Sequence, residues 1–299
     1  MLALVGPTAA GKSGLAVQVA QELRGEVVNT DAMQLYRGMD IGTAKLPVAQ
    51  RRGIRHHLVD VLEVAEPASV AEFQTMARAV VDECRRRGVV PVLVGGSVLY
   101  TRAVLDEFDF PGTHPGVRRR LERELAGLGP AVLHDRLAHL DPAAAARILP
   151  SNGRRVVRAL EVMEITGRPF SAVLPEHHYH YPDTVQVGIA APTEALRERI
   201  ERRVEQMWDA GFVGEVRRLE GCGLREGRTA SRAIGYAQVL DLLDGRIDES
   251  EAKERTVRAT QRFARRQMSW YRRDPRISWL DWDDPQLLAK AVSLAAQAT

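Results

Sequence analysis

The first residues able to do chemistry form a glycine-rich loop near the start of the chain. The loop consists of Gly6, Pro7, Thr8, Ala9, Ala10, Gly11, Lys12 and Ser13, and it matches the pattern G-x-x-x-x-G-K-[S/T]. Backbone N–H groups of such a loop, together with the lysine ammonium, cradle a diphosphate, and the Ser13 hydroxyl can hold Mg²⁺. The loop therefore predicts phosphate binding. It leaves the reaction open, because kinases, ATPases and GTPases share it, and the chain has no N-K-x-D guanine motif.

One carboxylate, Asp31, is the candidate general base. It follows the β-rich residues Val27 and Val28, where a carboxylate can face the phosphate loop and accept a proton from an incoming nucleophile. An aspartate at this point can also cap the following turn, and a small-molecule kinase would place its own base there. Position alone leaves these interpretations open.

The elements expected to position these residues alternate between strand and helix. Leu2 to Val5 predicts a strand that leads into the loop, and Leu15, Val19 and Leu23 recur behind it at helical spacing. Further strands are expected over 57–62, 89–94 and 185–190, a helix over 70–87 and a short last strand over 279–282. This alternation predicts an α/β fold with a parallel sheet, whose ligands bind at the carboxyl ends of the strands.

Strand signals stop after Leu105, and helical stretches follow to about Leu174. We therefore expect a P-loop parallel-sheet core over 1–110 and 185–299 with an inserted helical domain over 111–184. Asp141-Pro142 and Ser151-Asn152 are the expected helix starts in the insertion. A long helix is expected over 249–273, and one of its faces carries four arginines that suit either water or RNA phosphates: Arg255, Arg258, Arg262 and Arg265.

Composition indicates a globular protein with a full core, since the chain has 299 residues and 45% hydrophobic content. Its net charge of +3 is too mild to indicate a partner. We expect a cytoplasmic protein with no membrane partner, because the chain shows no signal segment and no membrane-spanning apolar run. Cys84 and Cys222 lack C-x-x-C spacing and are expected to be buried free thiols. We do not expect a zinc site at His177, His178 and His180.

Several longer motifs resemble the tRNA dimethylallyltransferases, also called isopentenylpyrophosphate transferases. The run DAMQLYRGMDIGTAK from Asp31 to Lys45 is similar to the family signature. Further similar motifs are HHLVD at 56–60, GGSVLY at 95–100, RALEV at 158–162, AIGY at 233–236 and ARRQMSW at 264–270. They follow in family order, and this collinear agreement is more specific than the phosphate loop alone.

The resemblance implies a P-loop core with a helical insertion, and transfer of a dimethylallyl group from dimethylallyl diphosphate to N6 of the adenosine 3′-adjacent to the anticodon in tRNA. It implies Asp31 as general base, Thr8 and Arg203 as further catalytic residues, diphosphate held by residues 6–13 with Arg203, and Mg²⁺ at Ser13. The tRNA contacts that it implies are Asp31, Ala32, Met33, Gln34, Ser97, Arg118, Arg154, Arg155, Val156, Val157, Arg158 and Arg232. Glu201, near Arg203, departs from a frequent asparagine. We expect a monomer whose partners are tRNA and dimethylallyl diphosphate.

Two other function classes stay open on the residues alone. A small-molecule kinase needs the same loop and a base at Asp31, but also ATP turnover and a nucleobase pocket for which the chain shows no motif. A nucleic-acid-binding module with a regulatory phosphate loop accounts for the arginine stripes. It leaves the run from Asp31 to Lys45 unexplained, so the motifs favour the transferase.

Overall fold

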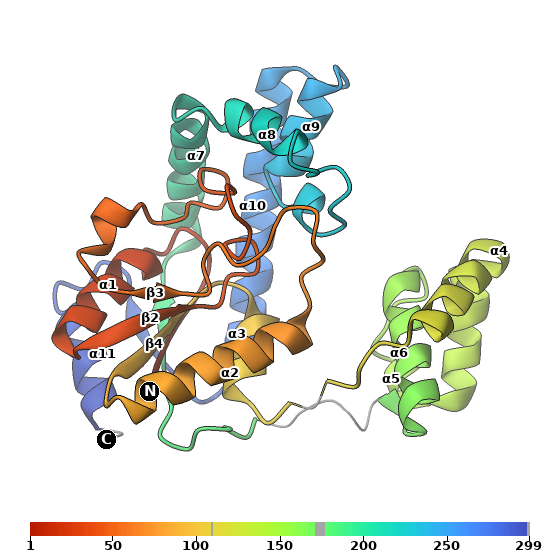
Figure 1. The fold of residues 1–299 in the computed structure, drawn as a ribbon, viewed down its shortest axis with the longest axis horizontal. Helices are drawn as coiled ribbons and strands as arrows, with labels where there is room; N and C mark the ends of the chain where they lie inside the picture. The colour runs from red at the N-terminus through yellow and green to blue at the C-terminus, as the bar shows by residue number, and fades with distance from the viewer. Residues whose placement is uncertain (109, 171–176, 298–299) are drawn as a thin grey trace. The chain divides into compact units, whose positions relative to one another are not determined.

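The computed structural model describes residues 1–108, 110–170 and 177–297, in two compact units (Figure 1). Unit 1 comprises Met1–Leu105 and Tyr179–Thr299, and unit 2 comprises Asp106–His178. The insertion was expected over 111–184, whereas unit 2 begins and ends a few residues earlier. The reason is that Tyr181, inside the expected insertion, is buried in a core of unit 1.

Unit 1 contains one six-stranded sheet in which every pair is parallel, in the order β3-β2-β4-β1-β5-β6. Its strands are β1 (Leu2–Val5), β2 (Gly25–Asn29), β3 (His56–His57), β4 (Val90–Val94), β5 (Val185–Ala190) and β6 (Ile277–Asp281). Its α-helices are α1 (Lys12–Glu22), α2 (Val70–Arg86), α3 (Val98–Leu105), α7 (Thr193–Asp209), α8 (Phe212–Glu220), α9 (Tyr236–Leu243), α10 (Glu249–Tyr271) and α11 (Leu287–Ala296). The predicted α/β class is confirmed.

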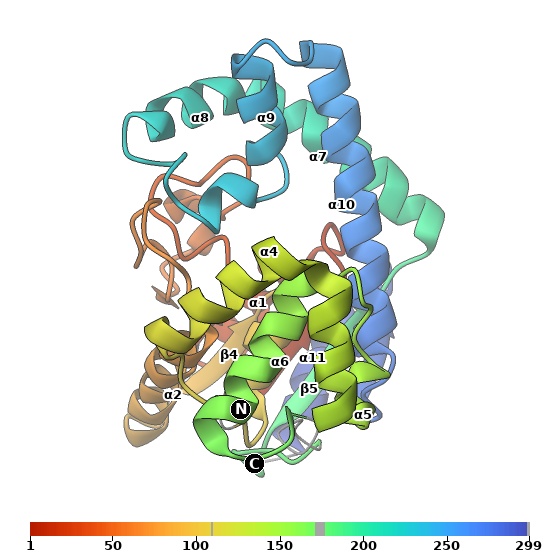
Figure 2. The same cartoon turned by 90° about the vertical axis from the view of Figure 1, so that its right-hand side faces the viewer.

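Both faces of the sheet are buried. Leu4 and Val92 pack in one core with α1, α7 and α11, whereas their neighbours Ala3 and Leu93 pack in another with α2 and α3. Strands covered on both faces are short continuous apolar runs, which is the pattern of β1 and β4. The long helix α10 contacts α7, α9 and α3, and it runs along unit 1 from α9 toward the sheet (Figure 2).

The strand expected over 57–62 is wrong in extent, since β3 contains only His56 and His57. Leu58 and Asp60 have φ values of +58° and +59°, so the chain turns where a strand would continue. Lys45 Nζ donates to Asp60 Oδ1 at 2.6 Å and stabilises this turn. A tertiary contact thus overrides the local β propensity of the segment.

Unit 2 is helical where it is described, with α4 (Pro115–Leu140), α5 (Pro142–Ala145) and α6 (Gly153–Thr166) around one apolar core. Both expected helix starts are confirmed, because the Asp141 carboxylate accepts from Ala144 N (3.0 Å) and the Asn152 side chain accepts from Arg155 N (3.3 Å). Helical stretches were expected to about Leu174, and α6 itself ends at Thr166, before Gly167, whose φ is +66°. Residues 171–176, and with them Leu174, lie outside the described residues.

No helix within the described ranges combines the length and apolar character needed to cross a bilayer. The prediction of two buried thiols is wrong for Cys222, which is exposed, while Cys84 is buried. Cys222 lies in the turn just after α8 and outside the apolar clusters, whereas Cys84 is on the core-facing side of α2.

Candidate functional site

The phosphate loop joins β1 to α1 and takes the left-handed backbone that its glycines predict. Gly6 has φ +135°, and a Cβ there would lie 2.9 Å from the Ile189 carbonyl oxygen, so no larger residue fits. Lys12 Nζ donates to the Pro7 carbonyl oxygen at 2.6 Å and is buried under the loop. Ser13, the next residue of α1, is exposed. The loop therefore encloses a cation and presents a hydroxyl beside it.

Lys12 is also near two other predicted site residues. Burial and, to a smaller extent, the charge of Arg203 lower the pKa of Lys12 to about 7 against the opposing effect of the Asp31 carboxylate. The structure thus brings Lys12, Asp31 and Arg203 together at the carboxyl ends of β1 and β2, although Asp31 is 19 positions after Lys12 in sequence. The Asp31 carboxylate is close enough to Lys12 for each charge to shift the pKa of the other group.

Arg203 is a half-buried cation that lacks a carboxylate partner among the described residues. Its Nη1 lies 3.4 Å from Thr8 Oγ1, in the loop. Glu201 accepts instead from Gln261 Nε2 at 3.3 Å, so this departure from the family pattern leaves Arg203 charged and available. An unneutralised cation in low dielectric attracts an anion strongly.

Arg199, one turn before Arg203 on α7, is a further site residue to which the sequence assigned no role. Its guanidinium lies over the Trp282 ring, 4.7 Å from the centroid. One of its nitrogens would lie 3.5 Å from a Cβ placed on Gly11 of the loop. The signal that could have revealed it is the four-residue spacing from Arg203, which places both on one helix face. Lys12, Arg199 and Arg203 together make a candidate anion site.

Asp31 is held in place through its own backbone. Asn29 Oδ1 accepts from Asp31 N at 2.9 Å, and Asn29 Nδ2 donates to the Asp31 carbonyl oxygen at 3.0 Å. Asp31 Oδ1 accepts from Met33 N at 2.9 Å, so the residue also caps the turn, as the alternative interpretation expected. Burial raises the pKa of Asp31, while the Met33 N–H and the charge of Lys12 oppose the rise.

Of the other expected contacts in unit 1, Ala32 and Ser97 are hydrogen-bonded to each other next to Asp31. Ala32 N donates to Ser97 Oγ at 3.1 Å, which joins the loop after β2 to the turn after β4. A small cavity of about 20 Å³ is bordered by residues from both the phosphate loop and the loop after β2, among them Ser13, Asn29, Gln34 and Lys45. Arg232 is exposed at the end of a 3₁₀ turn, Ala230–Arg232.

A buried carboxylate, Glu215 of α8, braces the segment that follows the base. It accepts from the backbone N–H groups of Asp40 (3.1 Å), Ile41 (2.7 Å) and Gly42 (3.2 Å), and from the Tyr236 hydroxyl (2.6 Å). Four donors on one carboxylate form a strong hydrogen-bond network. The conformation of the family-like run 31–45 thus depends on a helix far along the chain.

Replacing Glu215 with alanine is expected to lower the free energy of unfolding by about 3 kcal/mol or more, because each buried donor left unsatisfied costs roughly 1–3 kcal/mol. Urea unfolding followed by circular dichroism measures this change. The matched control is Glu251→Ala, which removes an exposed one-turn ion pair with Arg255 on α10. That control is expected to cost less than about 1 kcal/mol. Equal losses in the two variants would contradict the bracing role.

The predicted tRNA contacts in unit 2 fall into two groups, those bonded to a buried carboxylate and those at the start of α6. Arg118 and Arg158 both donate to the buried carboxylate of Glu161, the second at 2.8 Å, and Arg158 also donates to the Pro111 carbonyl oxygen at 2.6 Å. Arg154 and Arg155 are exposed at the start of α6, whereas the side chains of Val156 and Val157 lie in the core. Of this group, Arg154 and Arg155 have the side chains most available to RNA.

The arginine face of α10 is only partly cationic. Arg255 pairs with Glu251 and Arg258 with Glu254, each one turn away. Arg262 and Arg265 have no acidic partner within the described part of the chain. The net positive charge therefore concentrates in the second half of the helix, nearer the phosphate loop.

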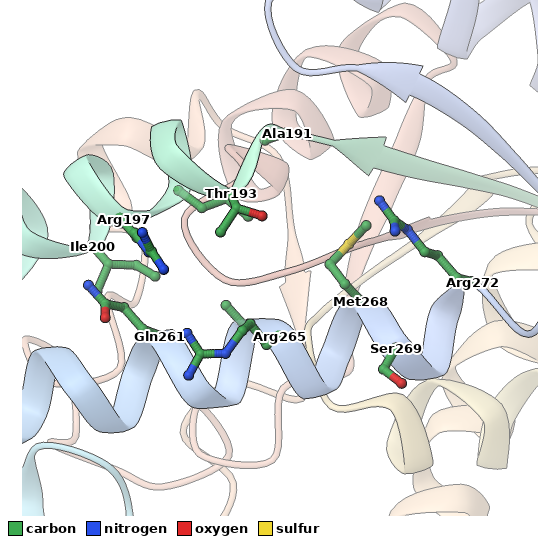
Figure 3. Close-up of a pocket in the computed structure, with 11 residues that line it drawn as sticks. Ala191, Thr193, Arg197, Ile200, Gln261, Arg265, Met268, Ser269 and Arg272 are labelled. Atoms are coloured by element: carbon green, nitrogen blue, oxygen red, sulfur yellow. The ribbon is translucent and has the colours of Figure 1, made fainter.

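A cavity of about 460 Å³ lies between α7 and α10, the helices that carry Arg203 and Gln267 (Figure 3). Its lining is partly apolar and partly cationic, with Leu196, Ile200, Met268, Arg197, Arg265 and Arg272 among its residues. No phosphate-loop residue is among those that line it in the described structure. The cavity is therefore a neighbour of the anion site rather than the anion site itself.

A group of metal-ligand side chains occurs away from this site, at Glu26, His57 and Cys84, with ligand atoms within 4.8 Å of one another. Arg87 donates to both Glu26 oxygens, at 2.9 and 2.7 Å, and His57 Nε2 lies 2.6 Å from the same carboxylate. The hydrogen bonds of Arg87, and to a smaller extent of His57, lower the pKa of Glu26 to about 2 against the effect of burial. Because a guanidinium occupies the carboxylate, we interpret the group as an ion-pair network.

Comparisons with known proteins agree over nearly the whole chain. Residues 34–274 match the family model described as IPP transferase. The chain is 62% identical to a curated tRNA dimethylallyltransferase from Nocardioides sp. (99% of this chain, 96% of the relative) and 61% identical to one from Thermobifida fusca (99% and 94%). Among solved structures, it resembles the full-length tRNA isopentenylpyrophosphate transferase of Bacillus halodurans, with TM-score 0.74 and 37% identity (99% and 95%). It also resembles a eukaryotic dimethylallyltransferase acting on tRNA, with TM-score 0.83 and 27% identity (99% and 76%).

Proposed function

The chain belongs to the IPP transferase family of tRNA dimethylallyltransferases, and on that premise we propose how its residues transfer a dimethylallyl group to tRNA. The donor is dimethylallyl diphosphate and the acceptor is N6 of the adenosine 3′-adjacent to the anticodon. The observation that supports this most directly is the meeting of Lys12, Arg203 and Asp31 around one loop. The enzyme acts as a monomer in the cytoplasm, where its tRNA substrate is found.

Stabilising the leaving group is the main chemical task. The adenine amine is a poor nucleophile because its lone pair is delocalised into the ring. As the bond from C1 to the diphosphate oxygen breaks, negative charge grows on the diphosphate, and backbone N–H groups of the phosphate loop other than that of Thr8 bind that charge together with Lys12, Arg199 and Arg203. Preorganised donors of this kind need no reorganisation during the reaction.

Asp31 completes the transfer as general base. N6 forms a bond to C1 of the dimethylallyl group, and its proton passes to the Asp31 carboxylate, so that diphosphate and N6-dimethylallyladenosine are the products. The base cannot react while stacked in the anticodon loop and must be extruded into the protein. Ala32, Met33, Gln34 and Ser97 surround Asp31 and are the residues that we assign to the extruded nucleotide.

Ser13 fits a role in holding Mg²⁺, because its hydroxyl is exposed beside the lysine at the start of α1. A Mg²⁺ ion prefers oxygen ligands and is commonly bound by one or two protein groups plus substrate phosphates. When bound, the ion would neutralise charge on the diphosphate. Arg154, Arg155 and Arg232 are exposed and are assigned to tRNA phosphates, while Arg118 and Arg158 would act by fixing the fold around Glu161.

Diphosphate binding is expected to take up a proton at Lys12. In the free protein the pKa of Lys12 is about 7, and the charge of a bound diphosphate would raise it. Above pH 7, Lys12 is then largely neutral in the free protein and charged in the complex. The number of protons taken up on binding therefore grows from pH 6 to pH 8.5, and the affinity for diphosphate weakens over the same range. Calorimetry of inorganic diphosphate in buffers with different ionisation enthalpies measures the uptake. Lys12→Met corrects for protons taken up by diphosphate itself, and equal uptake in both proteins would contradict the prediction.

The function is tested by supplying labelled dimethylallyl diphosphate and unmodified tRNA, with labelled ATP in a parallel reaction. We expect label to enter RNA only from the first donor. A tRNA in which the adenosine 3′-adjacent to the anticodon is replaced by guanosine is expected to accept none, because guanosine has no N6 amine. Phosphate transfer from ATP to a small acceptor would contradict the proposal and indicate a kinase.

A further inference from the structure

One buried amide on α10 joins the two loops that carry the donor and acceptor sites. Gln267 is 2% exposed. Its Oε1 accepts from Thr8 N of the phosphate loop at 2.8 Å, and its Nε2 donates to the Gly96 carbonyl oxygen of the turn after β4 at 2.7 Å. Only an uncharged amide of this length does both, because glutamate cannot donate when ionised and lysine cannot accept.

The connection continues from Gly96 to the general base. Ser97, the next residue, accepts from Ala32 N at 3.1 Å through its Oγ, and Ala32 directly follows Asp31. On the other side, Thr8 lies 3.4 Å from Arg203 through its side chain. A single chain of hydrogen bonds therefore runs from the loop that holds the leaving group, through Gln267, to the loop that holds the base.

The turn after β4 has room for the Gln267 amide because residue 96 is a glycine. A Cβ placed on Gly96 would lie 2.3 Å from Gln267 Nε2, so any larger residue would displace the side chain. Because Thr8 N–H is committed to Gln267, its backbone is fixed rather than left to adapt to the ligand. The phosphate loop and the Gly96–Ser97 turn are thus held at a set separation.

We propose that Gln267 is a positioning residue for dimethylallyl transfer, which sets the distance between the diphosphate cradle and Asp31. This inference rests on the proposed function. In-line attack requires reacting atoms to meet within a narrow range, and a displacement of about 1 Å can lower the rate about 10²-fold. Gln267 itself touches neither substrate and acts through Thr8 and Gly96.

Two variants separate its hydrogen bonds. Gln267→Glu keeps the acceptor for Thr8 N but places an anion against the Gly96 carbonyl, and Gln267→Met keeps the length while removing both bonds. In single-turnover assays at saturating substrates, each is expected to lower the rate of transfer by about 10- to 100-fold. The dissociation constant for tRNA is expected to change less than about threefold, since α10 does not lose its charged residues.

A matched control on the same helix is Thr256→Val, which removes a buried hydrogen bond from Thr256 Oγ1 to the Ala252 carbonyl oxygen, away from the loops. All proteins are assayed well below their unfolding temperatures. We expect Thr256→Val to lose stability yet transfer at the wild-type rate. A loss of rate in Thr256→Val as large as in Gln267→Met would overturn the positioning role, because general destabilisation would then explain both.

A double-mutant cycle with Gly96→Ala gives an independent test, since the two residues should act through the same contact. Gly96→Ala is expected to slow transfer about tenfold or more in the wild-type background and less than about twofold in Gln267→Ala, where no side chain remains to be displaced. An equal effect in both backgrounds would overturn the proposal. If the wild-type protein itself failed to transfer the label, the proposed function would fail instead, and the two failures are therefore distinguishable.

Discussion

Asp31→Asn is expected to lower kcat by about 10²- to 10⁴-fold, the usual contribution of a general base. Asparagine has almost the same shape, and its side-chain oxygen can still accept from Met33 N, but it cannot take the proton that N6 loses. The affinity for tRNA and for diphosphate should change little, because the effect falls on the chemical step. Rapid-quench single-turnover measurements with labelled donor give the rate of that step directly.

The same variant is expected to be more stable than the wild type at neutral pH. Burial raises the pKa of Asp31 above its value in the unfolded chain, so ionisation of this group disfavours folding as the pH rises through the raised pKa. The two proteins should have equal stability in acid, where both side chains are neutral. At higher pH, where Asp31 ionises, Asp31→Asn should be more stable than the wild type. Equal stability across the whole pH range, or retained turnover, would contradict the assignment of Asp31 as a partly buried base.

Arg203→Ala is expected to lower kcat by about 10²- to 10³-fold, the range measured when one preorganised donor to a developing charge is removed. Arg203 is half-buried beside Thr8, and it has no carboxylate partner in the described structure that could compete for it. Its charge is therefore available to the departing diphosphate. Single-turnover rates with saturating donor separate this loss from weaker donor binding.

Arg202 is the matched control, because it lies on the same helix α7 but is exposed. Arg202→Ala is expected to transfer at close to the wild-type rate. Arg203→Lys should recover part of the loss, since lysine keeps the charge but not the planar fork. A wild-type rate in Arg203→Ala would show that Lys12 and the backbone amides suffice, and would exclude Arg203 from the mechanism.

The sequence alone determined the features that depend on neighbouring residues. The phosphate loop was evident because its glycines, lysine and serine stand within eight positions, and the structure folds them around Lys12. The caps Asp141 and Asn152 were predictable because each bonds an amide three residues ahead. Apolar runs predicted the strands of a doubly covered sheet, and their order along the chain placed Asp31 at the same edge as the loop.

Only the tertiary structure decided which distant groups act on one another. Gln267 reaches Thr8 across 259 residues, and Glu215 reaches Asp40 across 175, separations for which periodicity carries no signal. Arg118 and Arg158 were predicted as RNA contacts from their positions alone, and only the fold shows that both also donate to the buried Glu161. Local spacing encodes contacts within one element, whereas the partners across loops follow from how the sheet orders its strands and where α7, α8 and α10 pack in unit 1. The separation between the diphosphate cradle and the base is a property of that packing.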